Sequence, residues 1–178
     1  MRLFLLALAL MIAAPAMAGA TSAPPPVAPP PEAAALQADY VLVEKAARRL
    51  TLWRNREIIA TYEIRLGLNP VGTKQQEGDK RTPEGLYWIT GRNPDSRFHL
   101  SLAISYPERW DRIMASHRGV NPGGDIVIHG LPNGVDPAKA LAIHRDGDWT
   151  DGCIAVTNTE IEDLWSRIPD GITIEIKP

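Results

Sequence analysis

The chain has 178 residues, a formal net charge of −2 and one cysteine, and 44% of its residues are hydrophobic. This length suits one folded domain with a real core. The balanced charge, without any basic run, argues against nucleic acid as a partner. No segment repeats at a fixed period, which excludes solenoids and propellers.

The first twenty residues have the three-part layout of a secretory signal peptide. A positive charge at Arg2 precedes an apolar run over residues 3–14, and the tripeptide 16–18 is an A-x-A cleavage signal. We expect cleavage after Ala18 or Ala20, giving a protein exported to the periplasm or cell envelope with no stable membrane span. Pro15 and the shortness of the leucine-rich part argue against the alternative, an uncleaved anchor.

Residues 21–37 are expected to form a proline-rich linker, with the sequence TSAPPPVAPPP at its start. Proline fixes φ and removes backbone donors, so this segment favours an extended polyproline II form. We interpret it as a semi-rigid tether, and a proline motif bound by a partner is the alternative. The folded domain is then expected over residues 38–178.

Short apolar or alternating stretches, separated by turn-forming sequences such as RNRE, GLNPVG and GRNPDS, predict a mainly β domain. This spacing is typical of a β-sandwich or a barrel-like fold. The expected strands are Tyr40–Val43, Arg49–Trp53, Ile58–Leu66, Gly85–Ile89, Leu100–Ser105, Ile126–Ile128 and Ile172–Ile176.

Two short helices are expected to interrupt the strands. DPAKALAIHR begins with Asp136 as N-cap and a proline at the first helical position. TNTEIEDLWSRI begins with a Thr157–Glu160 capping box. Its apolar residues recur at helical spacing, which predicts that one stripe faces the core.

Cys153 lies directly behind a glycine in DGDWTDGCIAVTN, residues 146–158. A lone cysteine cannot form a disulfide within its chain, and an inert buried thiol is one interpretation. Gly152, which lets a ligand approach closely, and the polar turn 150–152 favour a reactive thiol instead. Because the thiolate is the nucleophile, such a thiol needs a nearby base or cation.

His129 is the best candidate for that base, because DIVIHG predicts a buried strand ending in His-Gly. A neutral imidazole within hydrogen-bond reach can take the thiol's proton, if a carbonyl or carboxylate orients its other nitrogen. A structural histidine is the alternative. His99, His117 and His144 are expected on the surface.

IVIHG, followed some twenty residues later by TDGC, resembles the signature of the L,D-transpeptidase catalytic domain, or YkuD, family. The similarity continues in LTLWRNREIIATYEIRLG, GDKRTPEGLYWITGRN, ISYPERWD and NPGGDIVIHGLPNG, in family order. It covers Ala38 to Pro178 and implies that family's β-sandwich or barrel-like fold with two short helices.

The resemblance implies a role for each residue that matches the motif. Cys153 is the acyl-forming nucleophile, His129 its base, and the Gly130 carbonyl orients the imidazole. The backbone N–H groups of Asp151, Gly152 and Cys153 are the implied oxyanion donors, since a glycine turn can aim successive amides at one point. Candidates for substrate binding are Thr150, Tyr106 and Trp149, with core packing as the alternative for the two aromatic residues.

Two positions depart from the family pattern. Asp151 stands where histidine is common, and Ala155 where arginine or asparagine is common. A carboxylate facing the thiol would oppose thiolate formation, so we expect Asp151 to point away, either bonded to the loop or reserved for an amine of the substrate. Both departures put substrate selection in doubt more than the chemistry.

The implied reaction is peptide exchange in peptidoglycan. The sulfur attacks a stem-peptide amide between an L-centre and a D-residue, and an amino group of a second stem resolves the thioester. No metal or cofactor is implied, and carbapenems are implied as inhibitors.

Three alternatives remain at this point. Water can resolve the same thioester, which makes the protein a carboxypeptidase or endopeptidase. Another cysteine fold fits less well: papain-like enzymes place cysteine before histidine, and sortases need an arginine after the cysteine, whereas the next one here is Arg167. A catalytically silent wall-binding module is the third.

Overall fold

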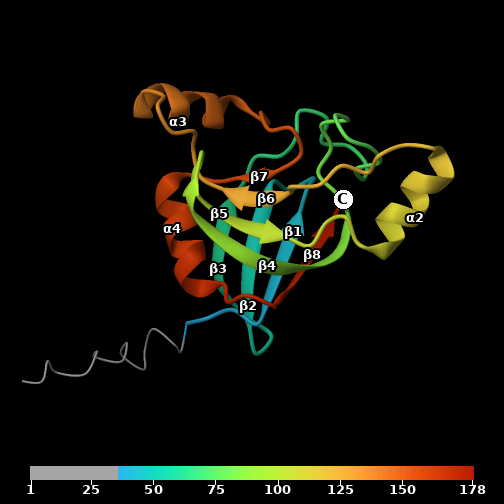
Figure 1. The fold of residues 1–178 in the computed structure, drawn as a ribbon. Helices are drawn as coiled ribbons and strands as arrows, with labels where there is room; N and C mark the ends of the chain where they lie inside the picture. Colours follow the sequence, from blue (N-terminus) through green and yellow to red (C-terminus); the bar gives the residue numbers. More distant parts are fainter. Residues whose placement is uncertain (1–35) are drawn as a thin grey trace, which may run out of the picture.

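The computed structural model describes residues 36–178, which contain eight strands and three helices joined by loops (Figure 1). The predicted signal peptide and residues 21–35 of the predicted linker lie outside these described residues. The strands are β1 (Tyr40–Glu44), β2 (Arg49–Arg54), β3 (Glu57–Glu63), β4 (Gly85–Ser96), β5 (His99–Ile104), β6 (Val127–His129), β7 (Ile154–Ala155) and β8 (Thr173–Lys177). The helices are α2 (Arg109–Arg118), α3 (Pro137–Asp146) and α4 (Asn158–Arg167).

All eight strands join in one sheet with the order β3-β2-β1-β8-β4-β5-β6-β7. The pairs β1–β8 and β6–β7 are parallel, and the other neighbours are antiparallel. The chain beyond β3 closes the sheet, because the amides of Arg65 and Ala155 each donate to the other's carbonyl at 2.8 Å. The sheet therefore curves round until β1–β3 lie behind β4 and β5 (Figure 1), which confirms the mainly β, barrel-like prediction.

The core lies inside the curved sheet, where the strands alternate buried and more exposed residues. Val41 and Val43 of β1 pair with Ile174 and Ile176 of β8, and all four side chains are buried. Each fully buried side chain of this size contributes about 1.5–3 kcal/mol relative to an exposed one. This pairing fixes the middle of the sheet, from which β4, β5 and β6 extend toward the site.

Strand β4 is longer than predicted, because residues 90–96, which include the whole expected GRNPDS turn, belong to it. The ladder between β4 and β5 shifts register between Asn93 and Ser96, which leaves Pro94 out of the pairing. Asn93 Oδ1 accepts a hydrogen bond from the Asp95 amide at 2.9 Å within this irregular stretch. A bulge thus accommodates a proline that a regular ladder would exclude, and the turn follows at residues 97–98.

Helices α3 and α4 begin where the sequence predicts. Asp136 caps α3 by accepting from the Lys139 amide, and Thr157 and Glu160 form the capping box of α4. The apolar stripe of α4 packs against the core, with Ile161, Leu164 and Ile168 fully buried and Trp165 packed beside them.

Helix α2 was not predicted, so the expectation of two helices was wrong by one. Its capping box uses Glu108 and Asp111 instead of the favoured serine or threonine. Ala115 is its only buried residue, so the sequence lacks the apolar stripe by which a helix is usually found.

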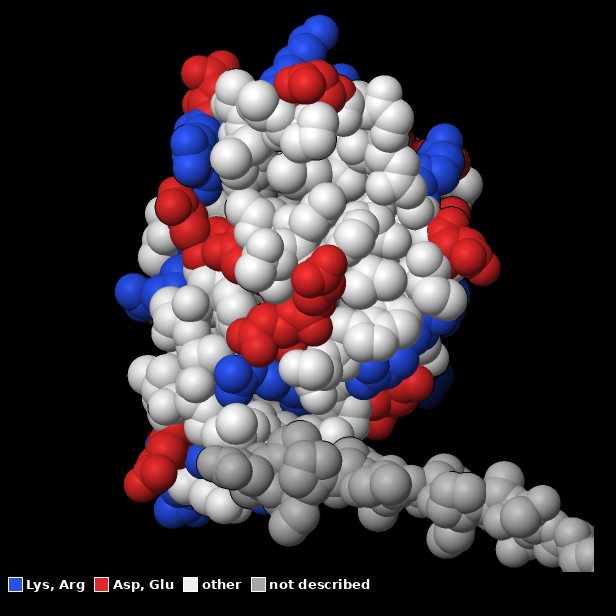
Figure 2. Space-filling view, turned by 90° about the vertical axis from the view of Figure 1, so that its left-hand side faces the viewer, with Lys and Arg blue, Asp and Glu red and all other residues white. Residues whose placement is uncertain are grey.

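The face that carries α3 and α4 shows acidic and basic side chains interspersed, and neither sign forms a continuous surface there (Figure 2). Within residues 36–178, no helix has the length and apolar character needed to cross a bilayer.

Candidate active site

His129 is held on a short strand between two others. In β6 it pairs with Ser101 of β5 on one side and Ala155 of β7 on the other. Its carbonyl accepts from the Val156 amide at 2.9 Å, and its side chain is only 2% exposed. The sheet therefore fixes the position from which the imidazole extends.

The orientation of the imidazole depends on the next residue, Gly130. The Nδ1 atom of His129 lies 2.7 Å from the Gly130 carbonyl oxygen, and a carbonyl only accepts, so Nδ1 carries the proton. In the neutral ring Nε2 is then the acceptor. A Cβ on Gly130 would lie 2.7 Å from Asn158 Oδ1 and 3.0 Å from Ile161, so only glycine fits this close approach.

Burial keeps the imidazole neutral. Removal from water lowers the pKa of His129 from 6.5 to about 4, and nearby His144 lowers it slightly further, while the Gly130 carbonyl opposes the shift. The ring also lies beside two aromatic rings, with centroids 4.4 Å from Phe98 and 5.5 Å from Trp149. At neutral pH the ring can therefore accept a proton but does not already carry a charge.

The turn that carries Cys153 is built round the hydroxyl of Thr150. This buried side chain donates to the Cys153 carbonyl at 2.7 Å and accepts from the Gly152 amide at 3.1 Å. Gly152 has φ 130°, and a Cβ there would lie 2.7 Å from the Arg81 carbonyl oxygen. Both the backbone conformation and the close approach require glycine.

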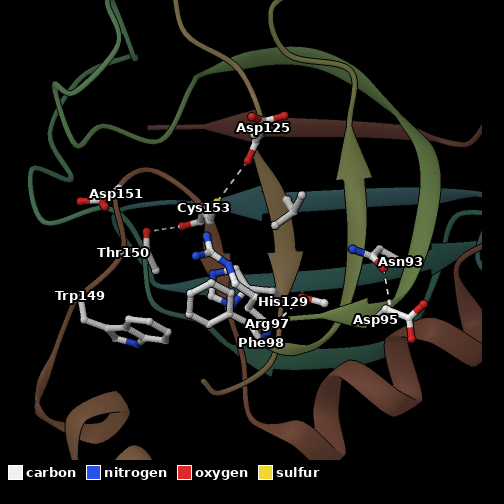
Figure 3. Close-up of a pocket in the computed structure, with 12 residues that line it drawn as sticks. Asn93, Asp95, Arg97, Phe98, Asp125, His129, Trp149, Thr150, Asp151 and Cys153 are labelled. Atoms are coloured by element: carbon white, nitrogen blue, oxygen red, sulfur yellow. Dashed lines mark hydrogen bonds between the residues drawn. The ribbon is translucent and has the colours of Figure 1, made fainter. Parts of the chain in front are cut away.

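The thiol of Cys153 is protonated at neutral pH. Burial raises its pKa above the ordinary value, and the carboxylates of Asp151 and Asp125 add to this, whereas the Val127 amide and Lys74 oppose it. The sulfur lies 3.5 Å from the Asp125 carbonyl oxygen, to which the thiol donates (Figure 3). The pair at rest is a neutral thiol and a neutral imidazole, so a base must act during the attack itself.

The backbone amides of the turn differ from the expectation in one respect. The Gly152 N–H is directed to Thr150 Oγ1, so it is not free for an oxyanion. The Asp151 and Cys153 amides donate to no partner within the described part of the chain. These two amides stay candidate oxyanion donors.

Cys153 and His129 line one cleft of about 510 Å³. Phe98 and Trp149 form an apolar wall beside the imidazole (Figure 3). Among the predicted residues, Trp149, Thr150 and Asp151 also line this cleft. Lining residues that the sequence analysis missed are Asn93, Asp95, Ser96, Arg97, Phe98, Asp125 and Val127.

A second cleft, of about 570 Å³, lies on the other side of the sulfur and shares Asp125, Asp151 and Cys153 with the first. Its walls are two loops, one between β3 and β4 and the other between α2 and β6. Glu77 joins them, because its amide donates to the Asn121 carbonyl at 2.8 Å and its carboxylate accepts from the Asn121 side chain at 2.7 Å. Cys153 can thus be reached from two sides.

The comparison with known families accounts for this arrangement. The family model of the L,D-transpeptidase catalytic domain, YkuD, matches residues 38–176. The chain belongs to this family. The suspected resemblance is therefore confirmed, and the sheet described above is a YkuD fold.

The chain is also similar to Escherichia coli YafK, provisionally named an L,D-transpeptidase. The two are 28% identical over 136 residues, which cover 72% of this chain and 46% of YafK. Campylobacter jejuni Pgp2, titled a helical cell shape determining protein, is 26% identical with a TM-score of 0.55 over 78% of this chain and 48% of Pgp2. Bdellovibrio bacteriovorus Bd1075 is 27% identical, with a TM-score of 0.53, and the match covers 80% of this chain and 49% of Bd1075. The chain spans about half the length of these relatives.

The side chain of Asp151, which departs from the usual YkuD residue, points away from the sulfur (Figure 3). It is 88% exposed, and its Oδ1 lies 3.9 Å from Lys80 Nζ. The expectation that it faces away from the thiol therefore agrees with the structure, although Lys80 already lies beside it.

The structure shows the core-packing alternative for Tyr106, whereas the surface expectation for His144 was wrong. Tyr106 lies in the core, where its hydroxyl donates to the Pro122 carbonyl and its ring packs against Tyr87, so it lines neither cleft. His144 was expected on the surface but is only 4% exposed, and its Nδ1 accepts from Trp149 Nε1 at 3.4 Å. His144 thereby supports an aromatic wall residue of the cleft.

Proposed function

We propose that this protein is an exported cysteine L,D-transpeptidase that remodels peptidoglycan stem peptides through a thioester at Cys153. The observation that carries the proposal is the oriented, neutral imidazole of His129 in the cleft that also contains the thiol. A buried histidine with a purely structural role would not need a second ring nitrogen that can accept a proton in the cleft that contains the thiol.

The acylation step follows from the neutral pair. As the sulfur attacks the carbonyl carbon of an L–D amide, His129 Nε2 takes the thiol proton. The Asp151 and Cys153 amides are the donors that we propose for the oxyanion of the tetrahedral intermediate. The imidazolium then gives its proton to the departing nitrogen, the C–N bond breaks, and a thioester and a free amine remain.

The second step consumes the thioester. An amine from another stem peptide, entering through the second cleft, attacks the thioester carbon and gives a proton to His129. The C–S bond then breaks, and the imidazolium returns that proton to the sulfur, which restores the thiol. Water in the place of that amine gives hydrolysis, so a carboxypeptidase or endopeptidase is the second candidate. The second cleft favours neither outcome by itself, because it admits a small nucleophile as readily as a peptide.

The wider role also belongs to this proposal. We expect the protein to act in the periplasm or cell envelope, where its partners are stem peptides as acyl donor and amine acceptor. Pgp2 is titled a cell shape determining protein, which supports a role in cell wall biogenesis and cell shape. Carbapenems are expected to acylate the same sulfur.

Purified peptidoglycan fragments test the proposal directly. We expect the protein to form a covalent adduct at Cys153, seen by mass spectrometry of the intact chain, and to release a D-residue from the donor. Cross-linked dimers among the products indicate transfer, and trimmed stems alone indicate hydrolysis. If Cys153 carries no adduct and neither product forms, the proposed function is wrong.

Asp151 offers a prediction about the acceptor. If its carboxylate binds the cationic amine, Asp151→Asn leaves acylation unchanged and slows transfer to a diamino-acid acceptor by about tenfold to a hundredfold. A labelled donor measures the first step and the acceptor measures the second. Lys80→Gln is the matched control, because loss of the lysine 3.9 Å away should strengthen acceptor use. Faster acylation by Asp151→Asn would instead mean that the carboxylate acts on the thiol.

A further inference from the structure

Arg97 has no role in the steps above, although it lies in the first cleft with the thiol and the imidazole. Of residues 36–178, it is the only lysine or arginine that lines this cleft. In the close-up its side chain extends from the β4–β5 turn toward Cys153 (Figure 3). We propose that Arg97 binds the free α-carboxylate of the D-residue that leaves the donor, so that the enzyme selects a terminal L–D bond. This inference rests on the proposed function.

The turn that carries Arg97 is fixed to the loop after the histidine by Asn133. The backbone N–H of Asn133 donates to the Arg97 carbonyl at 2.9 Å, and its side-chain Nδ2 donates to the Ser96 carbonyl at 2.9 Å. Its Oδ1 also accepts from the His99 amide at 3.1 Å. One side chain and its backbone thus hold three positions of the turn.

The same turn is fixed to the imidazole. Phe98 follows Arg97 directly, and its ring lies 4.4 Å from that of His129. The Phe98 carbonyl accepts from the Gly130 amide at 3.0 Å. The arginine backbone is therefore placed rigidly relative to the catalytic pair, as a specificity residue requires.

The guanidinium of Arg97 is available for a ligand. Three carboxylates line the same cleft, those of Asp95, Asp125 and Asp151. Within residues 36–178, however, no ion pair or hydrogen bond of the Arg97 side chain occurs. A planar guanidinium with five donors matches a carboxylate in two parallel hydrogen bonds, so an anionic ligand suits it.

The other cations beside the thiol are already paired. Lys74, in the second cleft, lies 2.9 Å from Asp79, and Lys80 lies 3.9 Å from Asp151. Among the described residues that line the two clefts, Arg97 is therefore the unpaired cation. In a donor that ends in a D-residue, one Cα alone separates the scissile nitrogen from the terminal carboxylate. That carboxylate must consequently lie in a cleft beside the reacting sulfur, and of the two such clefts only the first contains Arg97.

Two donors differing at one group test this assignment. One is a stem peptide ending in D-alanine as the free acid, and the other is the same peptide with a C-terminal amide. We expect the wild type to acylate faster with the acid, by kcat/KM, by about tenfold to a hundredfold, the effect of one charge-assisted hydrogen bond. Arg97→Gln should reduce the rate with the acid by this factor and leave the rate with the amide unchanged.

Matched variants separate a specific contact from a general change of charge. Arg56→Gln removes an arginine that lines a different hollow, with Tyr40 and Trp53, and should keep the preference for the acid. Asn133→Ala should weaken the preference without removing it. Arg97 is exposed, so Arg97→Gln is expected to fold, and its melting temperature checks this.

The outcomes are distinguishable. Equal rates for acid and amide in the wild type, or an unchanged preference in Arg97→Gln, would overturn the assignment of Arg97 while leaving the thioester chemistry intact. No adduct at Cys153 with either donor would overturn the proposed function and this inference with it.

Discussion

Replacing Cys153 with alanine is expected to lower acyl-enzyme formation by at least about 10³-fold while the protein stays folded. No other nucleophile among the described residues of the cleft can substitute for the sulfur. The Thr150 hydroxyl is held between the Cys153 carbonyl and the Gly152 amide, and the Ser96 hydroxyl accepts from the Phe98 amide. A hydroxyl fixed in this way and lacking a base cannot attack an amide.

The fold should tolerate this change because the thiol contributes little to the core. Its hydrogen bond to the Asp125 carbonyl is long, at 3.5 Å, and the turn is held by Thr150 instead. The measurements are adduct formation by mass spectrometry and the melting temperature, with Cys153→Ser as a variant of nearly equal volume. Residual peptide exchange above about 1 part in 10³ by folded Cys153→Ala protein would contradict the nucleophile assignment.

The parts of the fold that could be predicted from the sequence are those with a local signal. Helix α4 has a capping box and an apolar stripe, and both appear in the sequence itself. Helix α2 lacks such a stripe, since it buries only Ala115, so its existence depends on tertiary contacts such as that of Asp111 with the Tyr87 hydroxyl. The GRNPDS segment has turn-forming residues, but pairing with β5 makes it a strand with a bulge.

The residues of the candidate site likewise include some with a local signal in the sequence and some without one. Cys153 and His129 are found from the sequence because Gly152 precedes the one cysteine and Gly130 follows a histidine at the end of a predicted strand, and the structure places both in one cleft. Arg97 and Phe98 have no such signal. They reach the cleft only because β5 pairs with β6, which brings a hairpin turn over a histidine far along the chain. Pairing of this kind is a property of the sheet, and a single sequence does not contain it.

His129→Ala is expected to slow acylation at neutral pH by about 10²- to 10⁴-fold, the usual contribution of a positioned base. The reason is the raised pKa of Cys153. Because the thiol is protonated, little thiolate exists at neutral pH unless the imidazole takes the proton during the attack. His117→Ala, which removes an exposed histidine of α2, is the matched control and should have no effect.

The pH dependence distinguishes a base from a structural histidine. In the wild type, kcat/KM should be lost as pH falls through about 4, because the imidazole of His129 then gains a proton and can no longer accept one. His129→Ala should lose this acid limb. Its rate should instead rise about tenfold per pH unit toward alkaline pH, following the fraction of thiolate. If both proteins fold and their profiles coincide, the histidine only supports the sheet, and the proton must leave the sulfur by another route.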